Sequence, residues 1–223
     1  MNSYIEPLVA LYLQHANEQN AIQMQQYMRN KFQFLGIKAP ERRELLKQFL
    51  TEHHLPKEEK LEEVLQQLWD LPQREFQATG LDLLVKMKGV LTKDHIPLLE
   101  SLIIQKSWWD TVDLLASNTI GYLFQKYPEV IPIYAEKWIN SENMWLQRTA
   151  ILYQLKYKHK TDLNRLFRYI VQHAESEEFF IQKAIGWSLR EYSKTNPEAV
   201  RTFISEHQLK PLSKREGLKH IHK

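Results

Sequence analysis

The sequence predicts an all-α protein, built as a solenoid of HEAT-like helical repeats with a concave face. Glycine is scarce, with 6 in 223 residues, and the prolines lie between periodic segments rather than inside them. No strand-like alternation of polar and apolar residues persists, and no Asn-Gly or Asp-Gly pair marks a hairpin. This pattern of residues is typical of helices joined by short turns.

Prolines give the expected helix boundaries, because proline is tolerated in the first turn of a helix but breaks its interior. No low-complexity linker divides the chain, so we expect residues 1–223 to form a single domain. The boundaries are expected near Pro40, Pro56, Pro72, Pro97, Pro128, Pro197 and Pro211.

A weak internal repeat supports the solenoid. Four segments share an aromatic or apolar pair, then a polar residue, then an apolar helix, at spacings of 33, 37 and 35 residues. This spacing fits helix-pair repeats, and the missing TPR and ankyrin consensus favours a degenerate HEAT-like stack with a concave binding groove. The alternative is a compact bundle with chance resemblance between its helices. The second apolar residues of the four pairs are Phe76, Trp109, Leu146 and Ile181.

Composition excludes several classes of protein. The chain has no cysteine, so a disulfide framework and a thiolate metal site are both impossible. The N-terminus is too polar for a signal peptide, and no apolar run approaches the length of a membrane span. We therefore expect a cytoplasmic protein without a membrane partner.

The distribution of charge is more informative than the net charge of +3. Residues 1–111 carry 13 Lys and Arg against 15 Asp and Glu, whereas residues 112–223 carry 17 against 12. A basic half suggests a polyanionic partner such as a nucleic acid, although an ordinary solvated surface gives the same count.

The helix expected after Ser107 places a carboxylate beside an indole. Trp108 and Val112 lie on the line that best suits a core, whereas Trp109 and Asp113, four residues apart, share the adjacent face. Ser107 is expected to cap this helix. Asp113 is a candidate for catalysis, but pairing with a cation of the next repeat is the commoner fate of such a residue.

The helix expected from Phe180 to Lys194 has a basic side with a tryptophan in its middle. This side either packs on a neighbouring repeat or forms an aromatic platform flanked by phosphate contacts. The apolar side carries Ile181, Ile185, Ser188 and Tyr192. The basic side carries Lys183, Trp187, Arg190 and Lys194.

Two further basic segments are candidates for anion binding. In the helix expected from Trp145, Arg148 and Lys156 lie two turns apart and would either bridge phosphates or decorate the surface. Near the C-terminus, Ser213 before Lys214 is expected at the start of a basic helix, which would suit an anion, unless this stretch is a frayed tail.

Familiar catalytic and cofactor motifs are missing from the sequence. We find no phosphate-binding glycine loop, no dinucleotide fingerprint and no His-Glu-x-x-His pair, and His53-His54 alone is weak evidence for a metal. No local motif supports a Ser-His-Asp nucleophile. We therefore expect no metal and no cofactor, which leaves carboxylate and aromatic chemistry on a basic face.

A series of motifs runs in order along nearly the whole chain. They are FLGI at 34–37, PERR at 40–43, LWDLP at 68–72, REFQ at 74–77, SWWD at 107–110 with Asp113, WLQR at 145–148, FFIQKAIGW at 179–187 with REY at 190–192, and PLSKRE at 211–216. Aromatic strings of this length are specific. Together these motifs resemble the AlkD family of DNA alkylation-repair glycosylases.

The resemblance implies HEAT-like repeats that wrap duplex DNA, and an active site carried over by position. Lys38 departs from the uncharged polar residue expected there, which puts the DNA contact near it in doubt. The implied catalytic residues are Asp113, Trp109 and Trp187, supported by Arg148. The implied DNA contacts are Tyr27, Lys156, Phe179, Phe180, Lys183, Arg190, Lys194, Lys214 and Arg215.

The implied activity is hydrolysis of the glycosidic bond of cationic alkylated purines, such as 7-methylguanine and 3-methyladenine, in duplex DNA. The resemblance implies no lyase step and no swinging of the base into a pocket, and a groove that wraps DNA suggests a monomer. The alternatives are a non-catalytic HEAT-repeat protein that binds damaged DNA, and a protein-binding scaffold.

Overall fold

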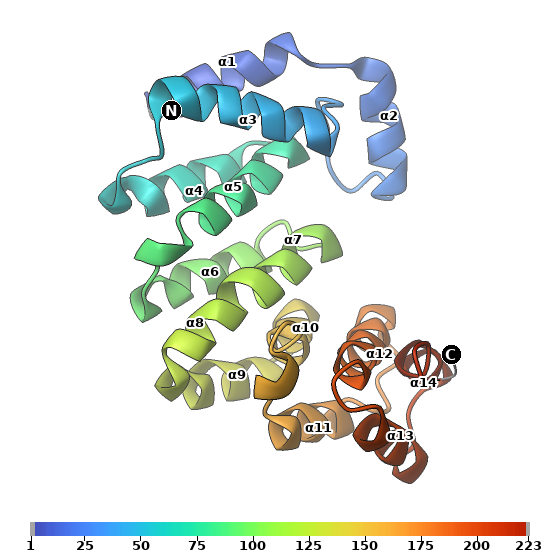
Figure 1. Ribbon diagram of the computed structural model, residues 1–223. Coiled ribbons are helices and arrows are strands. Elements are labelled where there is room, and N and C mark those ends of the chain that lie inside the picture. The colour runs from blue at the N-terminus through green and yellow to red at the C-terminus, as the bar shows by residue number, and fades with distance from the viewer. Residues whose placement is uncertain (1–2, 222–223) are drawn as a thin grey trace. The chain divides into compact units, whose positions relative to one another are not determined.

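The computed structural model describes residues 3–221, and every regular element in that range is helical (Figure 1). The only strand-like contact described there is one isolated β-bridge between Gln33 and Gln73. The chain divides into two compact units, one ending at Leu91 and one beginning at Thr92, and each is described by itself. The all-α class is therefore confirmed, whereas the single domain stays a prediction.

Within the first unit, the described residues 3–91 form five α-helices. They are α1 (Glu6–Gln14), α2 (Glu18–Tyr27), α3 (Ala39–His53), α4 (Leu61–Asp70) and α5 (Arg74–Lys86).

Residues 92–221, the described part of the second unit, form nine α-helices and one π-helical segment, Leu115–Ile120. The helices are α6 (Ile96–Ile104), α7 (Trp109–Leu114), α8 (Gly121–Lys126), α9 (Ile131–Ile139), α10 (Met144–Leu152), α11 (Leu163–Gln172), α12 (Phe179–Ser193), α13 (Pro197–Glu206) and α14 (Pro211–Gly217).

The repeat is more regular than the sequence suggested. Five helices begin 35 residues apart, at Ala39, Arg74, Trp109, Met144 and Phe179. The expected spacings of 33 and 37 residues, on either side of Trp109, were therefore each wrong by two residues, whereas the spacing of 35 was right. The tryptophan pair lies at the N-cap and first residue of α7, whereas Phe76, Leu146 and Ile181 are each the third residue of their helix.

A glutamine at the fourth residue of three of these helices explains part of the repeat. The side-chain amide of Gln77 donates to the carbonyl of Leu71 at 2.8 Å, and those of Gln147 and Gln182 donate six residues back at 2.6 and 3.1 Å. Each bond ties the turn before the helix to its first full turn. In α7 the same position is Val112, which is fully buried instead.

The loop before α3 is held by a buried carboxylate. Glu75 is 2% exposed and accepts the backbone N–H groups of Leu35, Gly36 and Ile37 at 3.1, 2.9 and 3.2 Å. Burial raises the pKa of Glu75, although these bonds oppose the rise. Glu75 thereby fixes the chain between α2 and α3.

Gly36 in this loop is expected to be intolerant of alanine. Its φ is +88°, and an added Cβ would lie 1.9 Å from the carbonyl oxygen of Asn17. Left-handed backbone strain and steric overlap together are expected to cost about 2–4 kcal/mol. Urea unfolding of Gly36→Ala measures this cost. Gly89→Ala is the control, since nothing lies within 4 Å of its Cβ, and equal stability of the two variants would contradict the expectation.

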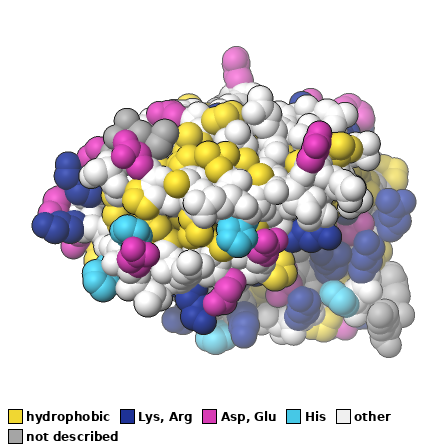
Figure 2. Space-filling model, turned by 90° about the horizontal axis from the view of Figure 1, so that it is seen from above, with side chains coloured by type: hydrophobic (Ala, Val, Ile, Leu, Met, Phe, Trp, Pro, Cys, Tyr) yellow, Lys and Arg dark blue, Asp and Glu magenta, His cyan; other side chains and the backbone are white. Residues whose placement is uncertain are grey.

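Helix α1 buries Leu8 and Tyr12 and leaves Glu6, Ala10, Leu13 and Gln14 exposed. Figure 2 shows hydrophobic side chains gathered over this part of the surface. The outer side of α1 therefore mixes apolar and polar side chains and carries no cation. No helix in residues 3–221 is long and apolar enough to cross a membrane.

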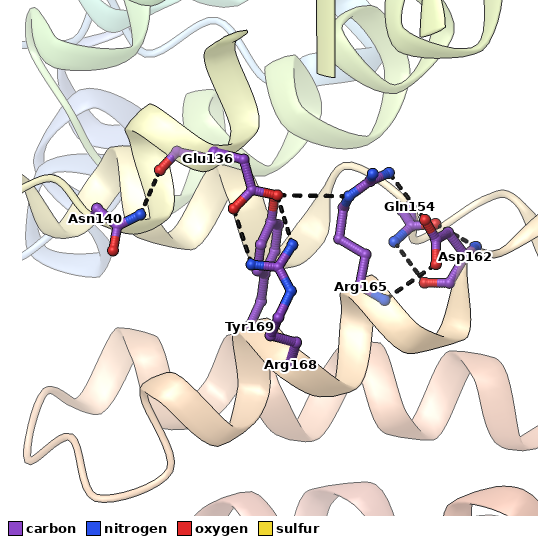
Figure 3. Close-up of polar contacts among 7 residues, drawn as sticks. All are labelled: Glu136, Asn140, Gln154, Asp162, Arg165, Arg168 and Tyr169. Atoms are coloured by element: carbon purple, nitrogen blue, oxygen red, sulfur yellow. Dashed lines mark hydrogen bonds and ion pairs between the residues drawn. The ribbon is translucent and has the colours of Figure 1, made fainter. Parts of the chain in front are cut away.

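A polar cluster joins α9 to α11 (Figure 3). Glu136 of α9 accepts two hydrogen bonds from Arg168 at 2.9 and 2.6 Å and one from the Tyr169 hydroxyl at 2.8 Å. Arg165 lies 3.7 Å away and pairs with Asp162 at 2.9 Å. The hydrogen bonds from Arg168 hold the pKa of Glu136 below its ordinary value, against a smaller effect of burial.

This lowered pKa predicts how the stability of Glu136→Gln depends on pH. The contribution of an ionised Glu136 is present above its unfolded pKa, about 4.3, and is lost as the pH falls through the lowered folded value. The wild-type protein is therefore expected to be modestly more stable than the variant at pH 7 and equally stable in strong acid. Thermal unfolding across this pH range measures the difference, and a difference that grows in acid would contradict the assignment.

Candidate active site

Helix α7 presents Trp109 and Asp113 one turn apart. Trp108 and Val112 are buried, as expected for the core line, whereas Trp109 and Asp113 are partly exposed. The expected cap was wrong: the N-cap of α7 is Trp108 in extended backbone, and the Ser107 hydroxyl donates to the carbonyl of Ile103 at 2.7 Å. The serine closes the end of α6 instead of opening α7.

A π-helical segment follows Asp113 within the same continuous helix. It runs from Leu115 to Ile120, and the Ser117 hydroxyl donates to the carbonyl of Asp113 at 2.8 Å. Such wide turns are rare and are frequent near functional sites. The segment therefore places a wider helical turn directly beyond the candidate carboxylate.

Asp113 forms a bidentate ion pair with Arg148. Its carboxylate oxygens accept from Nε at 2.7 Å and from Nη2 at 2.9 Å, while Nη1 donates to the carbonyl of Phe180. The two residues occupy the fifth position of α7 and of α10, so they are equivalent positions in neighbouring repeats. The expectation that Asp113 pairs with a cation of the next repeat is confirmed.

This ion pair is largely withdrawn from solvent. The Arg148 side chain is 1% exposed and that of Asp113 is 18% exposed. Burial raises the pKa of Asp113, and the hydrogen bonds and charge of Arg148 only partly oppose the rise. The result is a desolvated carboxylate whose charge depends on one arginine, with only its outer edge open to a ligand.

The indole of Trp187 lies among cations. The guanidinium carbon of Arg148 is 5.2 Å from its ring centroid, the Lys183 ammonium 5.3 Å and the guanidinium carbon of Arg190 5.9 Å. These distances are within the range of cation–π attraction. The predicted position of Trp187 in the middle of a basic face is therefore confirmed, and Arg148 links it to Asp113.

Glu216 of α14 is a functional candidate that the sequence did not single out. Its side chain is 4% exposed and lies 3.1 Å from the Lys183 ammonium, 3.2 Å from Arg190 Nη1 and 2.7 Å from the Lys219 ammonium. Burial alone would raise its pKa, but the bonds from Lys219 and Lys183 bring the pKa below the ordinary value. Its place at the end of the PLSKRE motif, as an acid among basic residues, was a signal in the sequence.

An aromatic cluster packs around Phe180, in the first turn of α12. The ring centroid of Phe180 lies 4.9 Å from that of Trp108 and 5.0 Å from that of Trp145. Phe179 contacts Phe180 edge-on at 5.3 Å and is itself 52% exposed. This packing fixes the first turn of α12, whose Phe180 carbonyl accepts from Arg148.

Four of the remaining predicted DNA contacts lie in the second unit, outside the Asp113–Arg148 pair and the cations near Trp187. Lys156 was expected two turns beyond Arg148 on one helix, but α10 ends at Leu152, so that expectation was wrong; Lys156 is exposed and its ammonium donates to Asn118. Lys194 follows α12 and pairs with Glu191, and both Lys214 and Arg215 are exposed on α14. Tyr27 belongs to the first unit, where it is 73% exposed at the end of α2. The DNA roles of these residues and of Lys156 stay predictions.

Ser213 does not serve the anion site expected at the C-terminal helix. It is fully buried inside α14, which begins at Pro211, and its hydroxyl donates to the carbonyl of Gln182 at 3.1 Å. The serine therefore fastens α14 to α12, and the anion-site expectation was wrong because α14 starts two residues earlier.

Comparisons with a protein-family model and with solved structures agree. The family model described as DNA alkylation repair enzyme matches residues 9–221. A solved structure described as a predicted DNA alkylation repair enzyme from Enterococcus faecalis is 38% identical, with a TM-score of 0.86, over 93% of this chain and 97% of that chain. No match was found among curated proteins. The chain therefore belongs to the DNA alkylation repair enzyme family.

Proposed function

We propose that this protein is a monofunctional DNA glycosylase that hydrolyses the glycosidic bond of cationic alkylated purines in duplex DNA. The observation that carries the proposal is the desolvated carboxylate of Asp113, one turn from Trp109 and joined through Arg148 to Trp187. Membership of the DNA alkylation repair enzyme family supports it.

The protein does not need to protonate the leaving base. A purine alkylated at a ring nitrogen already carries positive charge, so it departs without protonation. The positive charge then moves to the sugar, where an oxocarbenium-like transition state requires a nearby anion and a water molecule. Asp113 is the group we assign to both tasks, and partial burial strengthens its electrostatic effect.

The aromatic and basic residues around Asp113 are proposed to bind the DNA. The indoles of Trp109 and Trp187 offer faces for a cationic sugar and base, and the lysines and arginines of α12 and α14 offer contacts for phosphates. We propose duplex DNA as the partner of a monomer, acting without a cofactor and without swinging the base into a pocket. The absence of a base-reading motif from the sequence agrees with this last point.

The test is release of free base from duplex DNA that carries a single 7-methylguanine. We expect 7-methylguanine and an intact abasic strand, which is cut only after treatment with alkali. Strand cleavage without alkali would contradict the monofunctional assignment. Binding of the duplex without base release would overturn the proposed enzyme.

One observation favours a second candidate, a non-catalytic protein that binds damaged DNA. Both carboxylate oxygens of Asp113 already accept hydrogen bonds from Arg148, which is also the geometry of a purely structural ion pair. Such a protein would bind duplex DNA with an affinity that falls steeply with salt, yet would leave the glycosidic bond intact. A protein-binding scaffold would show no salt-dependent DNA affinity.

A further inference from the structure

We propose that Glu216 is a positioning residue for base excision, acting through the cations that surround Trp187. The inference rests on the proposed function, because it assigns a role within the same site. Glu216 lies outside the Asp113–Arg148 pair and has no hydrogen bond to either residue.

The contacts of Glu216 join two helices around one indole. One carboxylate oxygen lies 3.1 Å from the Lys183 ammonium, and the other lies 3.2 Å from Arg190 Nη1. Both cations lie within 6 Å of the Trp187 ring centroid, at 5.3 and 5.9 Å. Glu216 therefore touches the indole only through Lys183 and Arg190, from which a positioning role follows.

The packing of α14 on α12 fixes where this carboxylate lies. A Cβ added to Gly186 would lie 2.4 Å from the Cβ of Glu216 and 3.0 Å from the carbonyl of Ser213. The two helices lie side by side in the second unit (Figure 1), and a side chain at Gly186 would force them apart. Gly186 shares one face of α12 with Lys183 and Arg190, so the close contact places the carboxylate of Glu216 against the two cations that lie near the indole.

Electrostatics explain why an acid is needed at this position. Lys183, Arg190 and Lys219 converge on Glu216, and without a negative charge these three cations would repel one another. The cluster with Glu216 keeps a net charge of +2, which still attracts phosphate. Glu216 thus orders the cations without cancelling their attraction for DNA.

This arrangement predicts opposite effects of Glu216→Gln on binding and on chemistry. Removal of one negative charge from a DNA-facing surface is expected to leave the affinity for undamaged duplex unchanged or tighter. Misplaced cations and a displaced indole are expected to slow base release. Because a displacement of about 1 Å costs on the order of 10²-fold, we expect even a smaller displacement to lower the rate of base release by about tenfold or more.

The experiment compares Glu216→Gln with Glu198→Gln, which removes the same charge from an exposed pair with Arg201 on α13. Single-turnover release of 7-methylguanine and affinity for undamaged duplex are measured for both variants. Glu216→Asp keeps the charge and is expected to recover part of the rate. Equal release rates for the Glu216→Gln and Glu198→Gln variants would overturn the positioning role.

Tryptophan fluorescence separates failure of this inference from failure of the proposed function. Emission of an indole responds to nearby charge, so Glu216→Gln is expected to shift emission in the wild-type background but not in the Trp187→Phe background. If the wild-type protein releases no base, the proposed function fails and this shift alone decides whether Glu216 orders the cations at Trp187. An unchanged emission would then overturn the inference.

Discussion

Replacement of Asp113 by asparagine is expected to reduce release of 7-methylguanine by about 10²–10³-fold, the usual effect of removing one group that stabilises transition-state charge. Asparagine keeps the size of the side chain and an oxygen that accepts from Arg148 Nε. Its amide nitrogen, however, faces the donor Nη2, which lies 2.9 Å from the carboxylate in the wild-type protein. The anion that we assign to the oxocarbenium-like sugar is lost while the backbone stays in place.

The measurement is single-turnover base release at saturating enzyme, so that weaker DNA binding does not enter the rate. Asp110→Asn is the matched control, because it removes a partly exposed carboxylate from the first turn of the same helix. A parallel urea unfolding experiment is expected to show a loss of about 3 kcal/mol for Asp113→Asn, the low end of the cost of breaking a buried ion pair, because asparagine keeps one acceptor for Arg148. Full activity of this variant would remove Asp113 from the mechanism.

The sequence predicted helix positions and faces well where one helix decides the outcome. The basic face around Trp187 follows from a rotation of about 100° per residue within α12, and the core line through Trp108 and Val112 follows from the same rule in α7. Both predictions are confirmed by burial and by the cations around Trp187.

Positions that depend on two elements were harder to predict. Helix boundaries were misjudged at Ser107, Ser213 and Lys156, because local patterns do not tell a cap from a residue one turn inside or beyond a helix. The position of Glu216 requires α14 to lie against α12, and this contact depends on Gly186 and Ser213 together, which lie far apart in the sequence. Asp113 and Arg148 were both candidates, but their bond is visible only in three dimensions.

Replacement of Arg148 by methionine is expected to have the largest effect on stability. The guanidinium is 1% exposed and makes two hydrogen bonds to Asp113 and one to the carbonyl of Phe180. Loss of one partner of a buried ion pair costs about 3–5 kcal/mol, because the remaining charge is left without compensation. Arg168→Met is the control, since its pair with Glu136 is more exposed and such pairs contribute about 0–1 kcal/mol.

The same variant is expected to shift the pH dependence of base release. Burial already raises the pKa of Asp113, and Arg148 is the group that opposes the rise, so its removal raises the pKa further. The active carboxylate exists only above this pKa, so the acid limb of the pH–rate profile moves to higher pH and activity recovers with alkali. The double variant Arg148→Met with Asp113→Asn is expected to be more stable than the sum of the single changes predicts, because no buried charge is then left unpaired. An unshifted acid limb in Arg148→Met would mean that the titration of Asp113 does not control the reaction.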